Sequence, residues 1–387
     1  MTAPVPFSIS VDDAILADLR DRISRYPWAD LPDAGGWHCG TSLAYLYNLS
    51  RYWLDGYDWR VEEAKLNLLP HFRADVGGFP LHFIHVEGSG AKNPPLLLSH
   101  GWPGSFFEFA EIVEPLAHPE RFGGDPADGF DVVVPSLPGY GFSGRPARPI
   151  GPRTTAQLFN ALMTRTLGYE SYLAQGGDWG AVVTGWLGYR HADTCRAIHL
   201  NMIGLRSREM TPVTESEKAW DAKYQALFRQ EGAYLQLQAT KPQSLAFAMM
   251  DSPVGIAAWI LEKFGAWSHV PRDPLGSPAL GVRYSEDQLL TNIMIYLVTK
   301  SFATSTWMYR GFFDEQPIGM DPGTRVAVPT GVAAFPDPVY GPPPRSLVER
   351  GYNVTHWTDM PRGGHFAAME EPGLFVEDLR KFARTVR

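Results

Sequence analysis

The sequence predicts an α/β protein built on a mainly parallel sheet. Two observations indicate this fold class: short apolar runs rich in β-branched residues recur along the chain, and segments with helical spacing separate them. Such alternation is typical of parallel sheets, because consecutive parallel strands need a crossover connection. The strand-like runs are PPLLLSHG at 94–101, FDVVVPSLPG at 130–139, SYLAQGGD at 171–178, AIHLNMIG at 197–204, RVAVPTGVAAF at 325–335 and NVTHWTDMP at 353–361.

An N-terminal extension, residues 1–93, precedes this pattern. It opens with helical spacing in VDDAILADLRDRISRYPW at 11–28, continues through a stretch rich in Trp and Tyr, and ends with the strand-like run PLHFIHVEG at 80–88. We therefore expect the extension to lead into a first strand of the sheet.

The alternation stops between residues 205 and 310, where the spacing is mostly helical. This segment divides the core into residues 94–204 and 311–387. Ligands bind at the carboxyl edge of open α/β sheets, so an inserted helical lobe predicts a lid over that edge. Its helical runs are WDAKYQALFRQEGAYLQLQ at 220–238, SPVGIAAWILEKFGAW at 252–267 and SEDQLLTNIMIYLVTKSFATSTWMY at 285–309.

Composition excludes several classes of protein. The 387 residues are 44% hydrophobic and 20% charged, which is typical of a globular chain and sufficient for one large catalytic domain with an added lobe. The net charge of -8 is not gathered in runs, so it disfavours nucleic acid and anionic membranes as partners and favours a small-molecule substrate.

Cysteine usage and hydropathy predict a cytoplasmic protein. Only Cys39 and Cys195 are present, without a CxxC pair, so neither a disulfide framework nor a cysteine-rich metal site is expected. No apolar run approaches the roughly 20 residues of a membrane span, and we expect no targeting signal at the N-terminus.

The sharpest chemical motif is GGDWG at 176–180, between a strand-like run and a helical one. Small residues around a central nucleophile are required by a strained turn that exposes the central side chain, here Asp178. The chain contains no GxSxG, which disfavours a serine esterase or lipase. An aspartate nucleophile attacks sp³ carbon and forms an enzyme ester, so epoxides and alkyl halides are the expected electrophiles. An aspartate in a glycine turn is more often structural, so this motif needs support from others.

Two further motifs supply that support. HGWPGS at 100–105 follows a strand directly, so the backbone N–H of Trp102 is expected to form an oxyanion hole with the N–H of Trp179; the alternative is a tight turn with a packed Trp. GGHF at 363–366 lies between the last strand-like run and a final amphipathic helix. His365 is expected there as the base that deprotonates water.

With these motifs the chain resembles the microsomal-type epoxide hydrolases, including their soluble bacterial and fungal members, over nearly its whole length. The matching stretches are LNLLPHF, PLHFIHVEG, HGWPGSFFEF, PSLPGYGFSG, GGDWGA, AYLQLQATKP, DSPVGIAAWILEKF, LLTNIMIYL, VPTGVAAF and RGGHFAAMEEP. The resemblance implies an α/β-hydrolase fold with an N-terminal meander wrapped around the core, a helical lid, no metal and no organic cofactor.

The resemblance also implies a reaction and two further site residues. The reaction is the opening of an epoxide to a vicinal diol through a covalent aspartyl ester, in detoxification or specialised-metabolite biosynthesis. Two lid tyrosines of the family hydrogen-bond the epoxide oxygen, and by motif context these are Tyr234 and Tyr309. A phenol stays a donor at neutral pH. The apolar and aromatic lid favours a hydrophobic or aryl epoxide.

One position departs from the family. The third triad member is usually a carboxylate in a context such as FPxE or FPxD, but this chain reads FPDPV, so Pro338 stands at the usual acid position and Asp337 lies one residue earlier. We predict that Asp337 supplies the acid, because the flanking prolines stiffen the loop. Glu349 is the next candidate, whereas the loop after AIHLNMIG offers Asn201 and no carboxylate.

Two other functions stay open at this point. A haloalkane or haloacid dehalogenase also uses an aspartate in this turn, but a halide leaving group needs no tyrosine donor. The second alternative is not an enzyme but a catalytically silent protein that binds a ligand. It is suggested by Pro338, which stands where the family has its acid. If the protein is an epoxide hydrolase, its expected partners are an epoxide and water. The sequence does not determine whether the chain assembles into a homo-oligomer.

Overall fold

The computed structural model describes residues 3–90 and 93–386, which contain one nine-stranded sheet in the order β1-β2-β3-β5-β4-β6-β7-β8-β9. The strands are β1 (Val5–Phe7), β2 (His71–Val76), β3 (Phe79–Val86), β4 (Leu96–Ser99), β5 (Val132–Pro135), β6 (Tyr172–Gly176), β7 (Cys195–Leu200), β8 (Val326–Ala334) and β9 (Tyr352–Asp359). From β5 to β9 all pairs are parallel, and β1, β2, β3 and β5 pair antiparallel. The predicted mainly parallel α/β sheet is therefore confirmed.

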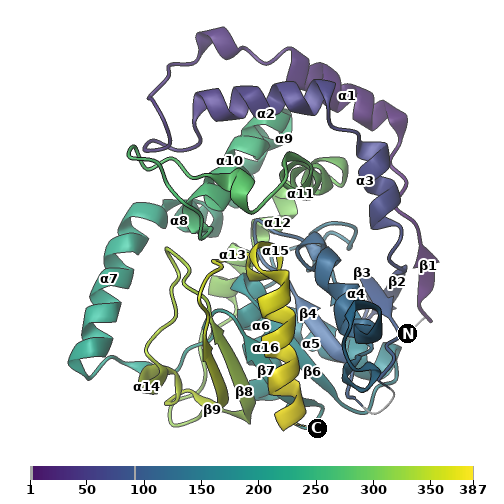
Figure 1. Cartoon of the computed structure of the whole chain (residues 1–387), viewed down its shortest axis with the longest axis vertical. Helices are drawn as coiled ribbons and strands as arrows, with labels where there is room; N and C mark the ends of the chain where they lie inside the picture. Colours follow the sequence, from purple (N-terminus) through teal and green to yellow (C-terminus); the bar gives the residue numbers. More distant parts are fainter. Residues whose placement is uncertain (1–2, 91–92, 387) are drawn as a thin grey trace.

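The central strands are buried on both faces, which explains why they read as continuous apolar runs. Every residue of β4, β5 and β6 is buried. Figure 1 shows helices on both faces, with α4 (Ala110–Ala117) and α16 (Pro372–Thr385) in front and α5 (Pro152–Ala161) and α6 (Asp178–Arg190) behind. The carboxyl ends of β4, β6 and β8 consequently meet at one edge, next to the inserted helical segment.

The N-terminal region adds three strands and three helices to this core. Helices α1 (Asp13–Ser24), α2 (Leu43–Asp55) and α3 (Trp59–Leu66) lie beside the inserted helices rather than on the sheet (Figure 1). Of the predicted extension, residues 1–93, positions 1–2 and 91–92 lie outside the described residues. Strands β1 and β2 were absent from the sequence prediction, because β1 has only three residues and β2 is not a continuous apolar run.

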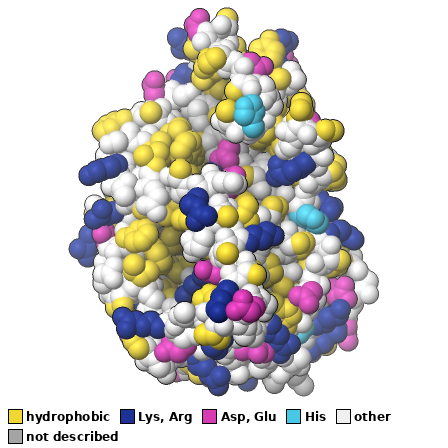
Figure 2. All heavy atoms as spheres, turned by 90° about the vertical axis from the view of Figure 1, so that its left-hand side faces the viewer, with side chains coloured by type: hydrophobic (Ala, Val, Ile, Leu, Met, Phe, Trp, Pro, Cys, Tyr) yellow, Lys and Arg dark blue, Asp and Glu magenta, His cyan; other side chains and the backbone are white. Residues whose placement is uncertain are grey.

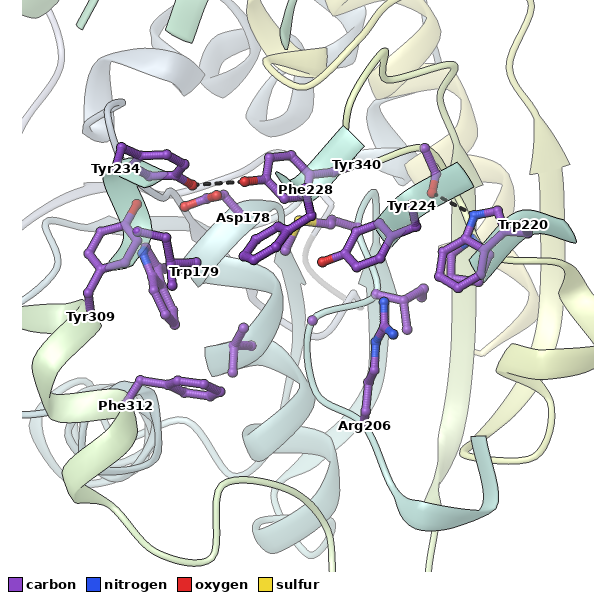
Figure 3. A pocket seen from close by; sticks show the side chains of 17 residues that line it. Asp178, Trp179, Arg206, Trp220, Tyr224, Phe228, Tyr234, Tyr309, Phe312 and Tyr340 are labelled. Atoms are coloured by element: carbon purple, nitrogen blue, oxygen red, sulfur yellow. Dashed lines mark hydrogen bonds between the residues drawn. The ribbon is translucent and has the colours of Figure 1, made fainter. Parts of the chain in front are cut away.

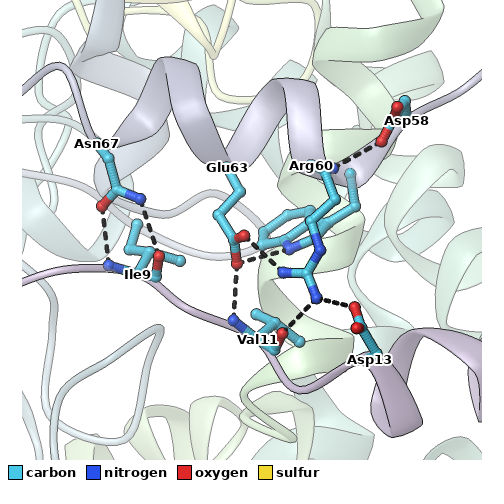
Figure 4. Close-up of polar contacts among 8 residues, drawn as sticks. Ile9, Val11, Asp13, Asp58, Arg60, Glu63 and Asn67 are labelled. Atoms are coloured by element: carbon cyan, nitrogen blue, oxygen red, sulfur yellow. Dashed lines mark hydrogen bonds and ion pairs between the residues drawn. The ribbon is translucent and has the colours of Figure 1, made fainter.

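Polar contacts join the chain entering α1 to helix α3 (Figure 4). The amide of Asn67 pairs with both backbone groups of Ile9, at 2.8 Å each. The Val11 N–H donates to Glu63 Oε1 at 2.7 Å, and Arg60 Nη2 donates to the Val11 carbonyl at 2.7 Å. Because these bonds satisfy backbone groups of a segment with no strand partner, they fix the path of the meander.

The inserted segment is helical, as its spacing indicates. Its helices are α7 (Glu215–Glu231), α8 (Ala233–Thr240), α9 (Pro242–Asp251), α10 (Pro253–Trp267), α11 (Glu286–Val298), α12 (Phe302–Ser305) and α13 (Trp307–Asp314). The predicted boundary at residue 310 falls inside α13, which continues to Asp314. Helix α8 packs against α13, so the two expected tyrosines meet although 75 residues separate them in sequence.

Two short helices complete the C-terminal part, α14 (Arg345–Val348) after β8 and α15 (Ala367–Glu370) before α16. In the described residues, no single helix is long and apolar enough to cross a membrane; α9 and α10 reach that length and composition only as a pair bent by 119°.

Candidate active site

Asp178 begins helix α6 directly after β6, in a turn that only small neighbours permit. Its φ is 49°, in the left-handed region that non-glycine residues rarely adopt. A Cβ on Gly176 would lie 2.1 Å from the Gly180 carbonyl oxygen, and a Cβ on Gly180 would lie 1.9 Å from the Ser99 carbonyl oxygen. The glycines of GGDWG therefore allow the close approach of turn, helix and β4 that presents the Asp178 carboxylate at the sheet edge.

The loop after β4 provides a donor to this carboxylate. The backbone N–H of Trp102 donates to Asp178 Oδ1 at 2.8 Å. A Cβ on Gly101 would lie 2.2 Å from the same oxygen, so the glycine of HGWPG makes room for it. Among the described residues no hydrogen bond joins the Trp179 amide to Asp178. The structure thus places one of the two expected oxyanion-hole donors on the carboxylate.

His365 lies between two carboxylates. Its Nδ1 is 2.7 Å from Asp337 Oδ2, and its Nε2 is 3.3 Å from Asp178 Oδ2. The side chains of His365 and Asp337 are 3% and 7% exposed, whereas that of Asp178 is 16% exposed. The arrangement brings together the nucleophile, base and acid expected from the sequence, with the histidine in the middle.

The charge state of His365 follows from this geometry. Burial lowers the pKa of the imidazole, but the carboxylates of Asp337 and Asp178 outweigh burial and raise the pKa to about 10. The two aspartates therefore favour the imidazolium form of His365, and loss of either carboxylate would lower the pKa of the imidazole.

The loop after β8 explains how Asp337 reaches the histidine from its displaced position. Asp337 Oδ1 accepts hydrogen bonds from the backbone N–H groups of Val339 and Tyr340, both at 2.8 Å, which leaves Oδ2 facing His365. Pro338 occupies the second position of this turn, directly after Asp337, where no N–H donor is needed. Glu349, the other candidate acid, instead pairs with Arg345 at 2.7 Å and is 45% exposed.

Tyr234 and Tyr309, on the inserted helices α8 and α13, line the same pocket as Asp178 (Figure 3). Tyr309 is 1% exposed, and its hydroxyl has no hydrogen-bond partner among the described residues. Tyr234 is 5% exposed, and its hydroxyl lies 2.9 Å from that of Tyr340. Burial and the negative charge nearby raise the pKa of both phenols well above 10, so they remain donors across the physiological range.

Eight of the 17 residues that line the pocket are aromatic, and the pocket has a cavity volume of about 180 Å³. Figure 2 views the molecule from the side that carries α7 and shows hydrophobic side chains around a hollow on this face. Its aromatic lining consists of Trp179, Trp220, Tyr224, Phe228, Tyr234, Tyr309, Phe312 and Tyr340. A small cavity with an apolar, aromatic lining and few polar groups fits a small organic ligand rather than a macromolecule.

Comparison with known proteins identifies the family of this chain. A family model described as epoxide hydrolase N terminus matches residues 4–109, and one described as alpha/beta hydrolase fold matches residues 94–258. Epoxide hydrolase 1 of Oryctolagus cuniculus is 36% identical over 409 residues, which cover 98% of this chain and 89% of that protein. The chain belongs to the epoxide hydrolase family.

Solved structures of this family share the whole fold. The juvenile hormone epoxide hydrolase of the silkworm Bombyx mori aligns with a TM-score of 0.86 and 31% identity, over 100% of this chain and 95% of that one. The epoxide hydrolase of Aspergillus niger aligns with a TM-score of 0.85 and 29% identity, over 100% and 97%. The α/β-hydrolase fold and the family resemblance expected from the sequence are thus confirmed.

Two residues of this epoxide hydrolase family member escaped the sequence prediction. Tyr340 joins the loop after β8 to helix α8, because its N–H donates to Asp337 and its hydroxyl lies 2.9 Å from that of Tyr234. Glu108 packs under the HGWPG loop, where a Cβ on Gly104 would lie 1.5 Å from Glu108 Oε1. Burial raises the pKa of Glu108 to about 8, with His365 opposing the rise. Two features of the sequence could have pointed to these residues: the glutamate in HGWPGSFFEF, and the tyrosine three residues after Asp337.

In the part of the chain that the structure describes, no group of three or more His, Cys, Asp or Glu side chains is arranged to hold a metal ion. The expectation that the reaction uses neither a metal nor an organic cofactor stays a prediction. The chemistry derived below depends on protein side chains and water alone.

Proposed function

We propose that the protein opens a hydrophobic or aryl epoxide to a vicinal diol through a covalent ester on Asp178. One observation carries the proposal: a carboxylate aligned by the Trp102 N–H lies in the same pocket as two buried phenols, Tyr234 and Tyr309. An epoxide needs both at once, because its carbon takes the nucleophile while its oxygen takes a proton.

In the first step, a carboxylate oxygen of Asp178 forms a bond to an epoxide carbon, and the bond from that carbon to the ring oxygen breaks. The oxygen leaves as an alkoxide and takes its proton from a phenol. Tyr309 is the better placed donor, because its hydroxyl has no other partner among the described residues. Leaving such a group unpaired costs about 1 to 3 kcal/mol, so hydrogen bonding to the epoxide oxygen recovers this cost.

In the second step, water hydrolyses the ester. Esterification removes the negative charge of Asp178, which is one of the two charges that raise the pKa of His365. The pKa of His365 therefore falls, and the imidazolium gives up its Nε2 proton, which restores the phenol that donated in the first step. The Nε2 is then able to take a proton from water. The hydroxide adds to the ester carbonyl, and the Trp102 N–H stabilises the oxyanion. When this intermediate collapses, the bond from the ester carbon to the diol oxygen breaks. The departing oxygen takes the proton of the new carboxyl group, which releases the diol and restores the Asp178 carboxylate.

Asp337 supports this step by holding the imidazole and stabilising its positive charge, at 2.7 Å from Nδ1. The aromatic pocket supports an apolar or aryl substrate. The only partners that this chemistry requires are the epoxide and water. We propose that this reaction serves detoxification or the biosynthesis of a specialised metabolite.

Dehalogenation is the second candidate, and one observation favours it. The indole Nε1 groups of Trp102 and Trp179 are buried without hydrogen-bond partners among the described residues, and such groups can bind halide. The two phenols argue against dehalogenation, because halide leaves without a proton.

The test supplies styrene oxide and a chloroalkane to the wild-type protein and to Asp178→Ala. We expect diol from styrene oxide, no halide from the chloroalkane, and no turnover by Asp178→Ala. Halide release without diol formation would reverse the assignment, and absence of both products would favour the silent binding protein.

A further inference from the structure

Arg206 lines the active-site pocket and has no role in the chemistry described above. It lies on the loop between β7 and α7, where neighbouring contacts fix the backbone: the Met320 N–H donates to the Arg206 carbonyl at 3.0 Å, and the hydroxyl of Tyr352 donates to the carbonyl of Leu205. The position of the side chain is thus set by the core of the protein rather than by a free loop.

The guanidinium of Arg206 lies beside a row of aromatic rings on α7. Trp220, Tyr224 and Phe228 follow one another at intervals of four residues, and their rings stack at centroid distances of 5.4 and 6.0 Å. The Arg206 guanidinium carbon lies 5.4 Å from the Trp220 ring centroid and 5.3 Å from that of Tyr224. Figure 3 shows the guanidinium directed toward these two rings and Asp178 on the Tyr234 side of the pocket.

Among the described residues the Arg206 guanidinium contacts the rings of Trp220 and Tyr224, and no carboxylate lies within 4.0 Å of it. Burial raises the pKa of Tyr224; the positive charge of Arg206 opposes this rise, and Asp221 and Asp337 add to it. Asp337 is committed to His365 and to two backbone amides. A cation in an aromatic pocket without an anionic partner is a site for an anionic group of the ligand.

We propose that the preferred substrates are epoxides whose apolar body ends in a carboxylate, and that Arg206 binds this carboxylate. The inference rests on the proposed function and specifies its substrate class. The pocket lining contains one carboxylate, that of Asp178, and one guanidinium, that of Arg206. The substrate carboxylate is repelled by Asp178 and attracted by Arg206, which turns the epoxide end of the molecule toward the nucleophile. The aromatic row on α7 covers the apolar body between the two ends.

Arg206 acts at a distance from the reacting atoms, so its contact is the same in the bound substrate and in the transition state. Removing such a contact raises KM and leaves kcat nearly unchanged. For a charge-assisted contact in a partly open pocket we expect KM to rise about 10- to 100-fold. Added salt should raise the wild-type KM as well, because it screens the charges.

The experiment compares three matched substrates: an ω-epoxy fatty acid, its methyl ester and the corresponding epoxyalkane. The proteins are the wild type, Arg206→Met, Arg206→Lys and the exposed control Arg208→Met. We expect the acid to have the lowest KM in the wild type and to lose this advantage in Arg206→Met. Arg206→Lys should retain part of it, and Arg208→Met should behave as wild type. The methyl ester and the epoxyalkane should respond little to any of the variants.

Two results would overturn the inference while leaving the proposed function intact. The first is an equal KM for acid and ester in the wild type. The second is the same rise in KM for all three substrates in Arg206→Met, which would indicate that Arg206 only packs against the pocket. Titration of a saturated fatty acid into wild type and Arg206→Met measures the same contact without chemistry. Equal affinities of the fatty acid for wild type and Arg206→Met would contradict the inference, whether or not the protein turns over epoxides. If only the proposed function is wrong, wild type should still bind the fatty acid more tightly than Arg206→Met.

Discussion

Asp337→Asn is the substitution whose consequence can be worked out most fully from the structure. Asp337 Oδ1 accepts two backbone N–H groups, from Val339 and Tyr340, so the oxygen of an asparagine must stay there. Its NH₂ group then faces Nδ1 of His365 and cannot accept a proton from it. The imidazole must place its own proton on Nε2, the atom that has to accept a proton from water.

The lost charge adds to this effect of the tautomer. A full charge on His365 at 2.7 Å from Asp337 corresponds to about 6 kcal/mol at an effective dielectric constant of about 20. With half of the charge developed in the transition state, about 3 kcal/mol is lost, which corresponds to roughly 10²-fold in rate. Together with the wrong tautomer, we expect ester hydrolysis to slow by about 10² to 10⁴.

The assay for Asp337→Asn separates the two steps. Rapid quench should find that the rate of ester formation on Asp178 falls much less than the rate of ester hydrolysis. Mass spectrometry of the intact protein should therefore find the ester accumulating after substrate is added. Glu349→Gln is the matched control, because Glu349 pairs with Arg345 and should leave both steps unchanged. Wild-type turnover of Asp337→Asn with no trapped ester would refute the reasoning, and loss of activity in Glu349→Gln would move the acid to that residue.

Three more outcomes are expected. Changing both Tyr234 and Tyr309 to Phe should slow ester formation by at least about 10²-fold in rapid quench, and wild-type rates would reduce the phenols to packing. The pKa of His365 is about 10 in the fold and about 6.5 in an unfolded chain, so its stabilising contribution, complete below pH 6.5, should be lost as the pH rises through 10; urea unfolding at several pH values should show a flatter profile for His365→Gln. Gly101→Ala should abolish ester formation while the protein stays folded by circular dichroism, because the added Cβ would lie 2.2 Å from Asp178 Oδ1; full activity would show that the carboxylate can shift without loss.

The parts of the fold that could be predicted from the sequence are those with one dominant physical signal. Strands β4 and β5 are buried apolar runs, and Asp178 and His365 lie in glycine-flanked turns whose steric demands are visible in GGDWG and GGHF. Strand β2 was missed because exposed polar residues, such as Arg73 and Asp75, interrupt its apolar pattern. Tyr234 and Tyr309 were found through family resemblance alone, since nothing local distinguishes them from other lid tyrosines.

What the sequence left open depends on contacts between distant segments. The direction of the Asp337 side chain is determined by the backbone N–H groups of Val339 and Tyr340, which no composition reveals. The four-residue spacing of Trp220, Tyr224 and Phe228 is readable, but the spacing does not say what their common face contacts. Only the packing of α7 beside the loop after β7 places that face next to Arg206.

The origin of the oxygen in the product tests the covalent mechanism most directly. A single turnover with enzyme in excess, in heavy-oxygen water, should give a diol whose new hydroxyl carries ordinary oxygen, because that oxygen comes from the Asp178 carboxylate. Digestion of the recovered protein should then find the heavy isotope in the peptide that contains Asp178. A first-turnover diol carrying solvent oxygen, with no label in that peptide, would show that water attacks the epoxide directly and would contradict the account.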